Sequence, residues 1–493
     1  MKKTVLILVV LAMLVPAAAL AATEFSLGGF IKLNSVWDST QNNFSPAFVI
    51  QRNNDQQFHH GRFNMTAQES RFNFTIKGPK VWGATTTGLI EMDFDPNTDA
   101  RQSNTHSYLA RLRHAMFRLN WPETELMLGQ YWGMFSEYSP EVTGDSQFTF
   151  HGFVNQRTPQ IRLTQKFGGN WTVAGAIVKP YDPDTSVDPT FAGTTVNPGQ
   201  VQAGSTGLEG QASETPQLQG KLAYEKDLYG KAAFYGRPRG LTAQVTGGWQ
   251  RTRYRANATT GTTTFTFGQN SFGTTPVVQR DQQYLNPWMV QGTLFIPVIP
   301  THSANLAGTA SLTAQWWIGQ GAAFVGGARD QDTSWLQFQY RGPAGQLFYD
   351  RKLTQQYGGY LQGQYWFNNQ WFVNLTWGMI RDFGIDQSSN SQAVSGNNPG
   401  GNVYASSGSG VAANNGGLGN DQVKLWQEYA LTLWYRPVEA LKFGLQYSYE
   451  RTDFLQKLNN PQAVGAVVGN QNSNGAKDFG EAHRIQFVAF MFF

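Results

Sequence analysis

Apolar and polar residues alternate with a period of two over long stretches of the chain. Between Phe25 and Asp38, apolar residues occupy mainly the odd positions and polar residues mainly the even ones: Phe25, Leu27, Ile31, Leu33 and Trp37 against Ser26, Lys32, Asn34 and Asp38. Successive side chains of a β-strand point to opposite faces. This segment therefore predicts a strand with one apolar face and one polar face.

The next segments predict a hairpin. In 71–78, phenylalanine and isoleucine alternate with polar residues, and Gly78-Pro79 predicts a turn. In 89–95 the alternation returns, with Glu91, Asp93 and Asp95 on the polar face. The same pattern recurs in 160–167, 241–250, 371–379 and 441–450. We therefore expect an all-β protein.

The connections between these segments alternate between short and long. Short turns are predicted at 78–79, 120–122, 168–170, 368–369 and 437–439, and long polar loops at 39–67, 132–156, 180–213, 255–283, 385–421 and 455–480. Short periplasmic turns and long extracellular loops are typical of transmembrane barrels. We predict an antiparallel transmembrane β-barrel of sixteen strands, or eighteen if 335–340 and 346–351 also cross the membrane.

The N-terminal residues predict export. Lys2 and Lys3 precede an apolar run from Val5 to Val15, and Ala19-Leu20-Ala21 matches a signal-peptidase site. The run is too short to span a bilayer as a helix. We therefore expect 1–21 to be a signal peptide, 22–493 to be the barrel, and the outer membrane of a Gram-negative bacterium to be its location.

Composition agrees with a barrel. Aromatic residues make up 14% of the chain and charged residues also 14%, as expected if aromatic side chains form girdles at the membrane interfaces. The absence of cysteine excludes disulfides, thiolate metal sites and covalently attached haem in this chain. The 37 basic and 33 acidic residues nearly balance, so we expect no nucleic-acid partner.

The last segment resembles the C-terminal signature by which the barrel-assembly machinery recognises outer-membrane proteins. Phe487, Ala489, Met491 and Phe493 lie at alternate positions, and the sequence closes on the aromatic residue. The alternative is an ordinary buried strand.

The polar faces of the predicted strands identify candidate pore-lining residues. They are Arg71, Lys77, Glu91, Asp93, Arg111, Arg113 and Arg162. One hypothesis is a basic wall that faces acidic groups across the lumen and steers anions, which salt would weaken. The other is a set of ion pairs that neutralise one another in a wet interior.

The segment 132–156 is the candidate constriction loop, because it follows the fifth predicted strand, as the inward-folding loop does in many porins. It carries Trp132, Glu137, Tyr138, Glu141 and Asp145. A plain extracellular loop is the alternative, since nothing in the sequence itself requires the segment to bend inward.

No segment predicts a metal or catalytic site. The acidic cluster Asp182, Asp184 and Asp188 matches no complete calcium loop. His59, His60 and His114 lack the partners of a zinc site or a nucleophilic triad, so we expect solvated or interfacial histidines. We expect no metal, no cofactor and no enzymatic activity.

Several motifs resemble those of the DcaP-like porins of Gram-negative outer membranes. They are Arg111-Leu112-Arg113-His114-Ala115, Gly129-Gln130-Tyr131-Trp132, Pro159-Gln160-Ile161-Arg162, Tyr357-Gly358-Gly359-Tyr360, Leu433-Trp434-Tyr435-Arg436-Pro437 and Gly444-Leu445-Gln446-Tyr447. The resemblance implies a trimer of sixteen-stranded barrels that admits small anionic organic acids past lining arginines. The periplasmic helical segment of some relatives has no counterpart here, and the loops are longer.

The sequence thus favours a porin that passes small hydrophilic solutes, preferentially anions such as organic acids. Its expected partners are membrane lipid, lipopolysaccharide, the assembly machinery and further copies of the chain. The main alternative is a barrel sheath around a multihaem cytochrome. A folded-in loop would favour the pore, and a wide, unobstructed lumen would favour the sheath.

Overall fold

A computed structural model describes residues 23–40, 60–94, 109–144, 150–181, 215–254, 265–267, 270–272, 283–326, 335–341, 347–353, 355–382, 403–406, 423–454 and 479–493. The expected signal peptide 1–21 lies outside these residues. So do most residues of the expected loops 180–213, 255–283, 385–421 and 455–480.

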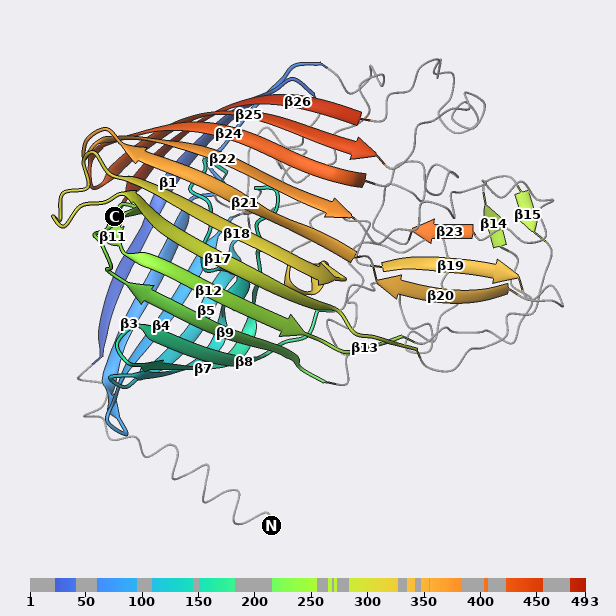
Figure 1. Ribbon diagram of the computed structural model, residues 1–493, viewed down its shortest axis with the longest axis horizontal. Helices are drawn as coiled ribbons and strands as arrows, with labels where there is room; N and C mark the ends of the chain where they lie inside the picture. The colour runs from blue at the N-terminus through green and yellow to red at the C-terminus, as the bar shows by residue number, and fades with distance from the viewer. Residues whose placement is uncertain are drawn as a thin grey trace, which may run out of the picture.

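One antiparallel sheet closes on itself to form a barrel (Figure 1). Each wall strand pairs with the next along the chain, and residues 30–38 of the first strand pair with residues 484–492 of the last. The wall consists of β1 (Glu24–Asp38), β2 (Arg62–Thr66), β3 (Arg71–Val81), β4 (Ala84–Asp93), β5 (Arg111–Asn120), β6 (Thr124–Trp132), β7 (Arg157–Phe167), β8 (Trp171–Val178), β9 (Gln217–Lys226), β12 (Leu241–Trp249), β17 (Trp288–Ile299), β18 (Ala310–Gln320), β21 (Gln355–Trp366), β22 (Trp371–Asp382), β24 (Val423–Val438), β25 (Leu441–Phe454) and β26 (Phe479–Phe492).

These strands fill sixteen positions in the wall, because β2 and β3 are two halves of one position. Residues 34–38 of β1 pair with β2, and residues 24–30 pair with β3. The sixteen-strand prediction is therefore confirmed. The predicted loop 39–67 was too long, since β2 already joins the wall at Arg62, where the short RFNMT segment gives little periodicity to read.

The eighteen-strand alternative is wrong. β19 (Trp335–Arg341) and β20 (Leu347–Leu353) pair with each other, and β19 also pairs with β23 (Val403–Ser406), in a separate three-stranded sheet. β18 and β21 pair directly along eleven residue pairs, so the wall has no room between them for two more strands. The separate sheet lies beyond the end of the barrel that carries the long connections (Figure 1).

Smaller elements occupy the connections. They are η3 (Met134–Ser136), β10 (Ala232–Phe234), β11 (Arg237–Arg239), β13 (Thr252–Tyr254), β14 (Phe265–Phe267), β15 (Asn270–Phe272), β16 (Gln283–Leu285) and η4 (Ala322–Val325). No helix in the described ranges is both long enough and apolar enough to cross a bilayer.

The two faces of the wall differ as the alternation predicts. On β1, Phe25 and Ile31 are 70% and 57% exposed on the outside, whereas Lys32 is fully buried on the inside. Closure leaves no unpaired strand edge within the membrane, where an unsatisfied backbone group costs several kcal/mol. The sheet therefore spans the membrane with an apolar outer face and a polar lumen.

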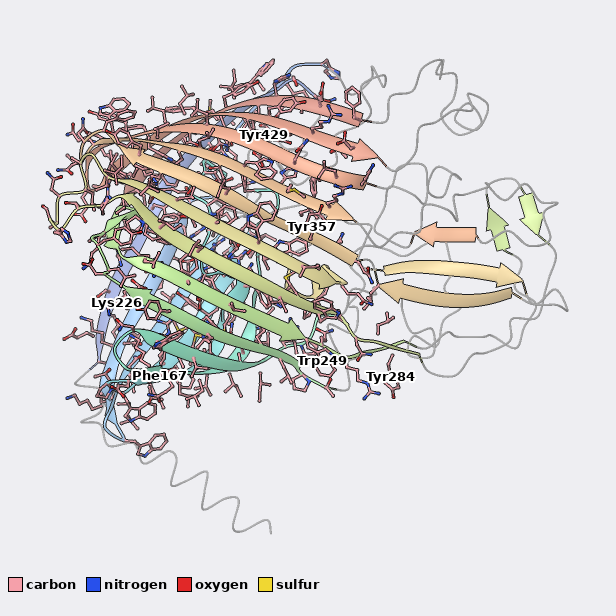
Figure 2. All side chains as sticks on the ribbon, viewed as in Figure 1. Phe167, Lys226, Trp249, Tyr284, Tyr357 and Tyr429 are labelled. Atoms are coloured by element: carbon pink, nitrogen blue, oxygen red, sulfur yellow. The ribbon has the colours of Figure 1, made fainter. Side chains whose placement is uncertain are left out.

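Exposed aromatic residues lie near both ends of the wall strands, as in the girdles of transmembrane barrels; Figure 2 labels one from each end, Phe167 and Trp249. The end with the short turns carries Phe167, Trp171, Tyr365, Phe367 and Trp371, and the opposite end carries Trp37, Phe63, Trp249 and Trp288. Trp249 and Trp288 face each other across β12 and β17.

The first periplasmic turn lies further along the chain than predicted. β3 continues past Gly78-Pro79, and the two-residue turn is Trp82-Gly83, with φ angles of 52° and 79°. Positive φ at both positions is the geometry that suits a tight hairpin. Pro79 falls within a register shift between Gly78 and Val81, where its missing N–H leaves no gap in the hydrogen-bond ladder.

The fold predicts a large penalty for charge on the outer face. Leu375, in the middle of β22, is 64% exposed, and an arginine near the bilayer midplane costs about 2–4 kcal/mol. We expect Leu375→Arg to lower the free energy of unfolding in lipid vesicles by about this amount. Leu375→Met should leave that free energy nearly unchanged, and equal stability of the two variants would contradict a lipid-facing position.

Candidate functional site

An arginine cluster lines one side of the lumen, where β3, β4 and β5 are neighbours. Asp93 is fully buried and accepts hydrogen bonds from Arg111 Nε and Nη2, each at 2.8 Å, and from Arg113 Nη1 at 2.6 Å. Arg113 Nε also donates to Glu91 at 2.8 Å, and Arg71 Nε lies 3.6 Å from the same carboxylate. Glu91 and Asp93 are thus direct partners of the arginines and do not face them across the lumen.

A β-bulge brings two successive residues of β5 into the lumen. Glu91 pairs with His114 and Met92 with Leu112, so Arg113 is the extra residue. Arg113 and His114 are both buried, and the His114 ring packs against Tyr131 and Trp132. His114 is therefore neither solvated nor interfacial as expected, because strict alternation does not foresee a bulge.

Further arginines extend this cluster, and sequence reasoning missed Arg118 and Arg157. Arg118 lies over the Tyr131 ring at 4.7 Å and Arg157 over the Trp132 ring at 4.9 Å. The charges of Arg113, Arg111 and Arg71 repel Arg157 and that of Asp93 attracts it, but Arg157 has no ion pair with a carboxylate in the described part of the chain. The aromatic faces stabilise these guanidinium groups where carboxylates are few.

Of the other predicted lining residues, Arg162 belongs to the arginine cluster, but Lys77 lies apart from it. Arg162 is buried on β7, with Nη1 3.6 Å from Glu137 and its guanidinium 5.9 Å from the Tyr131 ring centre. Lys77 is exposed near the periplasmic end of β3 and pairs with exposed Glu24 at 3.3 Å. An exposed pair of this kind contributes little.

The segment that follows β6 lies inside the barrel, and we call its described residues, 133–144 and 150–156, the inserted segment. Trp132 is the last residue of β6, and most of the described residues from Gly133 to Gln156 are buried. Lys221 Nζ on β9 donates to Glu137 at 2.6 Å, and Lys442 Nζ on β25 donates to Glu141 at 2.5 Å. Asp145 lies outside the described residues.

Tyr138 fixes this segment between two parts of the barrel. Its carbonyl oxygen accepts a hydrogen bond from Tyr360 Oη on β21 at 2.7 Å, and its ring packs against Phe234. Burial raises the pKa of the Tyr138 phenol to about 12. The phenol therefore stays neutral and adds no charge to the lumen at physiological pH.

Glutamine side chains bind the backbone of the inserted segment. Gln219, Gln362 and Gln446 accept hydrogen bonds from the backbone N–H groups of Met134, Glu141 and Thr143 at 3.1, 3.1 and 3.0 Å. Gln315 Nε2 donates to the carbonyl of Phe135 at 3.3 Å. The amides thus replace the secondary-structure partners that an irregular segment lacks. The one feature of the sequence that could have indicated this role is the recurrence of glutamine at inward positions of successive strands.

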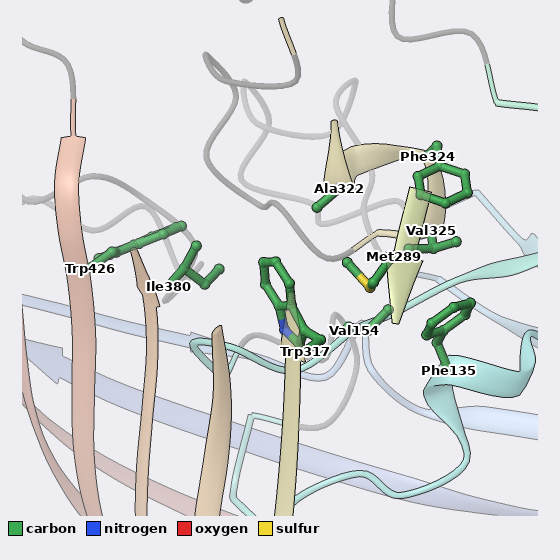
Figure 3. Packing of buried hydrophobic residues seen from close by; sticks show 9 residues of the cluster. All are labelled: Phe135, Val154, Met289, Trp317, Ala322, Phe324, Val325, Ile380 and Trp426. Atoms are coloured by element: carbon green, nitrogen blue, oxygen red, sulfur yellow. The ribbon is translucent and has the colours of Figure 1, made fainter. Parts of the chain in front are cut away.

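Both ends of the inserted segment also pack on an apolar cluster inside the barrel (Figure 3). Phe135 and Val154 come from the segment, and the wall supplies residues from β17, β18, β22 and β24. The cluster consists of Phe135, Val154, Met289, Trp317, Ala322, Phe324, Val325, Ile380 and Trp426. Trp317 Nε1 also donates to the carbonyl of Gly152 at 2.8 Å.

Glycines let the segment approach the wall closely. A Cβ on Gly378 would overlap the carbonyl oxygen of His151, and a Cβ on Gly152 would overlap that of Gly359. Gly152 also has φ of 82°, which favours glycine. The Tyr357-Gly358-Gly359-Tyr360 motif therefore has a packing role against 150–153.

A second polar network contacts the segment at His151. His151 Nδ1 lies 3.0 Å from Glu428 Oε2 on β24, and Glu428 faces Glu450 across β24 and β25. Arg484 on β26 donates through Nε to Asp38 at 2.7 Å, and its charge acts on both glutamates. Within the described ranges, no group of three or more metal-ligating side chains could hold an ion.

The contacts of the inserted segment divide the wall into two arcs. The inserted segment bonds to β9, β18, β21, β22, β24, β25, β26 and β1. The arginines belong to β3, β5 and β7, which occupy the rest of the circumference. We call the first the amide arc and the second the arginine arc.

No protein-family model and no curated protein matches the sequence. Solved structures do match it. The outer membrane channel DcaP of Acinetobacter baumannii aligns with a TM-score of 0.57 and 16% identity over 96% of this chain and 98% of that one. OprB of Pseudomonas putida (0.49, 10% identity, 96% and 94% covered) and the anion-selective porin of Comamonas acidovorans (0.47, 8%, 96% and 100%) also align.

The fold is therefore that of an outer-membrane channel. More particularly it is the fold of the DcaP channel, so the resemblance noted in the sequence is confirmed at the level of fold.

Close packing at Gly378 gives a testable consequence. We expect Gly378→Ala to push 150–152 off the wall and lower the free energy of unfolding by about 1–3 kcal/mol, as overpacking does. Gly363→Ala on the neighbouring β21 is the matched control, since a Cβ there meets nothing within 4 Å. Denaturant unfolding in detergent micelles measures both, and equal stability would contradict the close approach.

Proposed function

We propose that the protein is a non-enzymatic porin of the outer membrane through which small hydrophilic anions, organic acids among them, diffuse between the inserted segment 133–156 and the arginine arc. The segment is the constriction in this proposal. The observation that carries it is the division of the lumen: amides, together with Lys221 and Lys442, bind the segment on one arc, and the arginines gather on the other.

The balance of charge on the arginine arc supports anion preference. Asp93 and Glu91 pair with Arg111, Arg113 and Arg71, whereas among the described residues Arg118 has a single carboxylate partner, Glu125 at 3.7 Å. Arg111 and Arg118 keep 27% and 25% of their side chains exposed. A positive field in a narrow aqueous passage concentrates anions.

The sheath hypothesis has less support. A barrel that encloses a cytochrome needs a wide lumen, but here residues 133–144 and 150–156 lie within it, and their hydrogen bonds reach from β9 to β1. An inserted loop of this kind suits a diffusion pore.

Biogenesis and assembly belong to the same proposal. Phe487, Met491 and Phe493 are exposed on the outer face, where the assembly machinery would reach them. Removal of 1–21, contact with lipopolysaccharide and association of three copies are the remaining parts of the proposal.

Current measurement in planar bilayers tests anion preference. Each guanidinium lowers the energy of an anion 4 Å away by about 1 kcal/mol even in bulk water. We therefore expect the double variant Arg118→Gln, Arg157→Gln to reduce the anion-to-cation permeability ratio several-fold, as read from reversal potentials in a KCl gradient.

Lys80→Gln is the matched control, since Lys80 is an exposed basic residue near the periplasmic end of β3. It should leave the reversal potential unchanged. An unaltered potential in the double variant would remove the arginine arc as the source of selectivity, and the absence of wild-type channels would remove the porin assignment.

A further inference from the structure

A second element enters the lumen from the periplasmic end. The connection between β9 and β12 forms the small hairpin β10–β11, which lies at the same end of the barrel as the C-terminus (Figure 1). Ala232 and Ala233 are buried, and Ser311 Oγ on β18 donates to the carbonyl of Ala233 at 3.0 Å. Ala233 also belongs to an inward apolar cluster that includes Trp366 and Trp434. The hairpin is therefore inside the periplasmic mouth.

The tip of this hairpin contacts the inserted segment. Tyr235 Oη lies 3.1 Å from the carbonyl oxygens of both Ser139 and Pro140, to which its one proton is donated. The Phe234 ring lies 5.4 Å from the Tyr138 ring, and the Arg239 guanidinium lies 4.9 Å from that ring's centre. The segment at 138–140 is thus held by the wall on one side and by the hairpin on the other.

The hairpin turns at Tyr235 and Gly236 with the same backbone geometry as the Trp82-Gly83 turn. Tyr235 and Gly236 have φ of 50° and 71°, so they form the two central positions of a tight turn. Glycine or asparagine suits the first position best, and other residues there cost free energy. The contacts with Ser139 and Pro140 stabilise Tyr235 in this conformation.

We propose that Tyr235 is a positioning residue that props the constriction from the periplasmic side and so fixes the open width of the pore. This inference rests on the proposed function, because it gives a second support to the segment that the porin assignment treats as the constriction. Tyr235 belongs to the hairpin and not to the arginine arc, so it sets conductance without setting ion preference.

Single-channel recording of Tyr235→Phe tests the proposal. This variant keeps the ring and removes only the hydroxyl, so folding should be preserved. Since one hydrogen bond contributes about 1 kcal/mol and so changes a docked population about five-fold, we expect open-channel current noise and the frequency of sub-conductance events to rise about five-fold. The reversal potential should stay as in the wild type. Tyr235→Ala, which also removes the ring, should raise both further.

Tyr229→Phe is the matched control, because Tyr229 lies in the same connection, is exposed, and makes no side-chain hydrogen bond within the described ranges. It should record as the wild type does. If the wild-type protein forms anion-preferring channels but the noise is unchanged in Tyr235→Phe and Tyr235→Ala, Tyr235 does not position the constriction. The porin assignment would then still hold. A shifted reversal potential would overturn the claim that Tyr235 acts on width alone.

Discussion

Inside a closed sheet every polar side chain needs water or a protein partner, because an unsatisfied buried group costs about 1–3 kcal/mol. The alternation that gives the barrel its apolar outer face places glutamine, threonine and charged residues in the lumen. The inserted segment 133–156 meets this need on more than half of the circumference, and its own irregular backbone is satisfied by the same contacts. Wall and segment therefore depend on each other.

The arginine arc is the part of the wall that lies outside the amide arc. Arg111 and Arg113 are held by Asp93 and Glu91, and buried pairs of this kind contribute more to geometry than to stability. Arg118 and Arg157 rest on aromatic rings instead. The result is a rigid basic surface opposite a segment whose carboxylates Glu137 and Glu141 are neutralised by Lys221 and Lys442.

The sequence predicted the barrel well, because alternation is a local signal that each strand carries by itself. It also identified Arg71, Arg111, Arg113 and Arg162 as inward residues. It failed where geometry depends on a partner strand: the bulge at Arg113, the position of the Trp82-Gly83 turn and the separate sheet of β19 and β20. Gln219, Gln362 and Tyr235 were missed because their roles depend on contacts 85 to 221 residues away or across the lumen.

Reactivity of single cysteines tests directly whether the passage follows the arginine arc, since the chain has no cysteine of its own. Thr87 pairs with Arg118 on this arc, and Thr432 is buried behind the inserted segment, where it bonds to Gln446. We expect an anionic thiol reagent to modify Thr87→Cys rapidly and block the current, and to modify Thr432→Cys slowly. Faster reaction at Thr432→Cys would contradict the account.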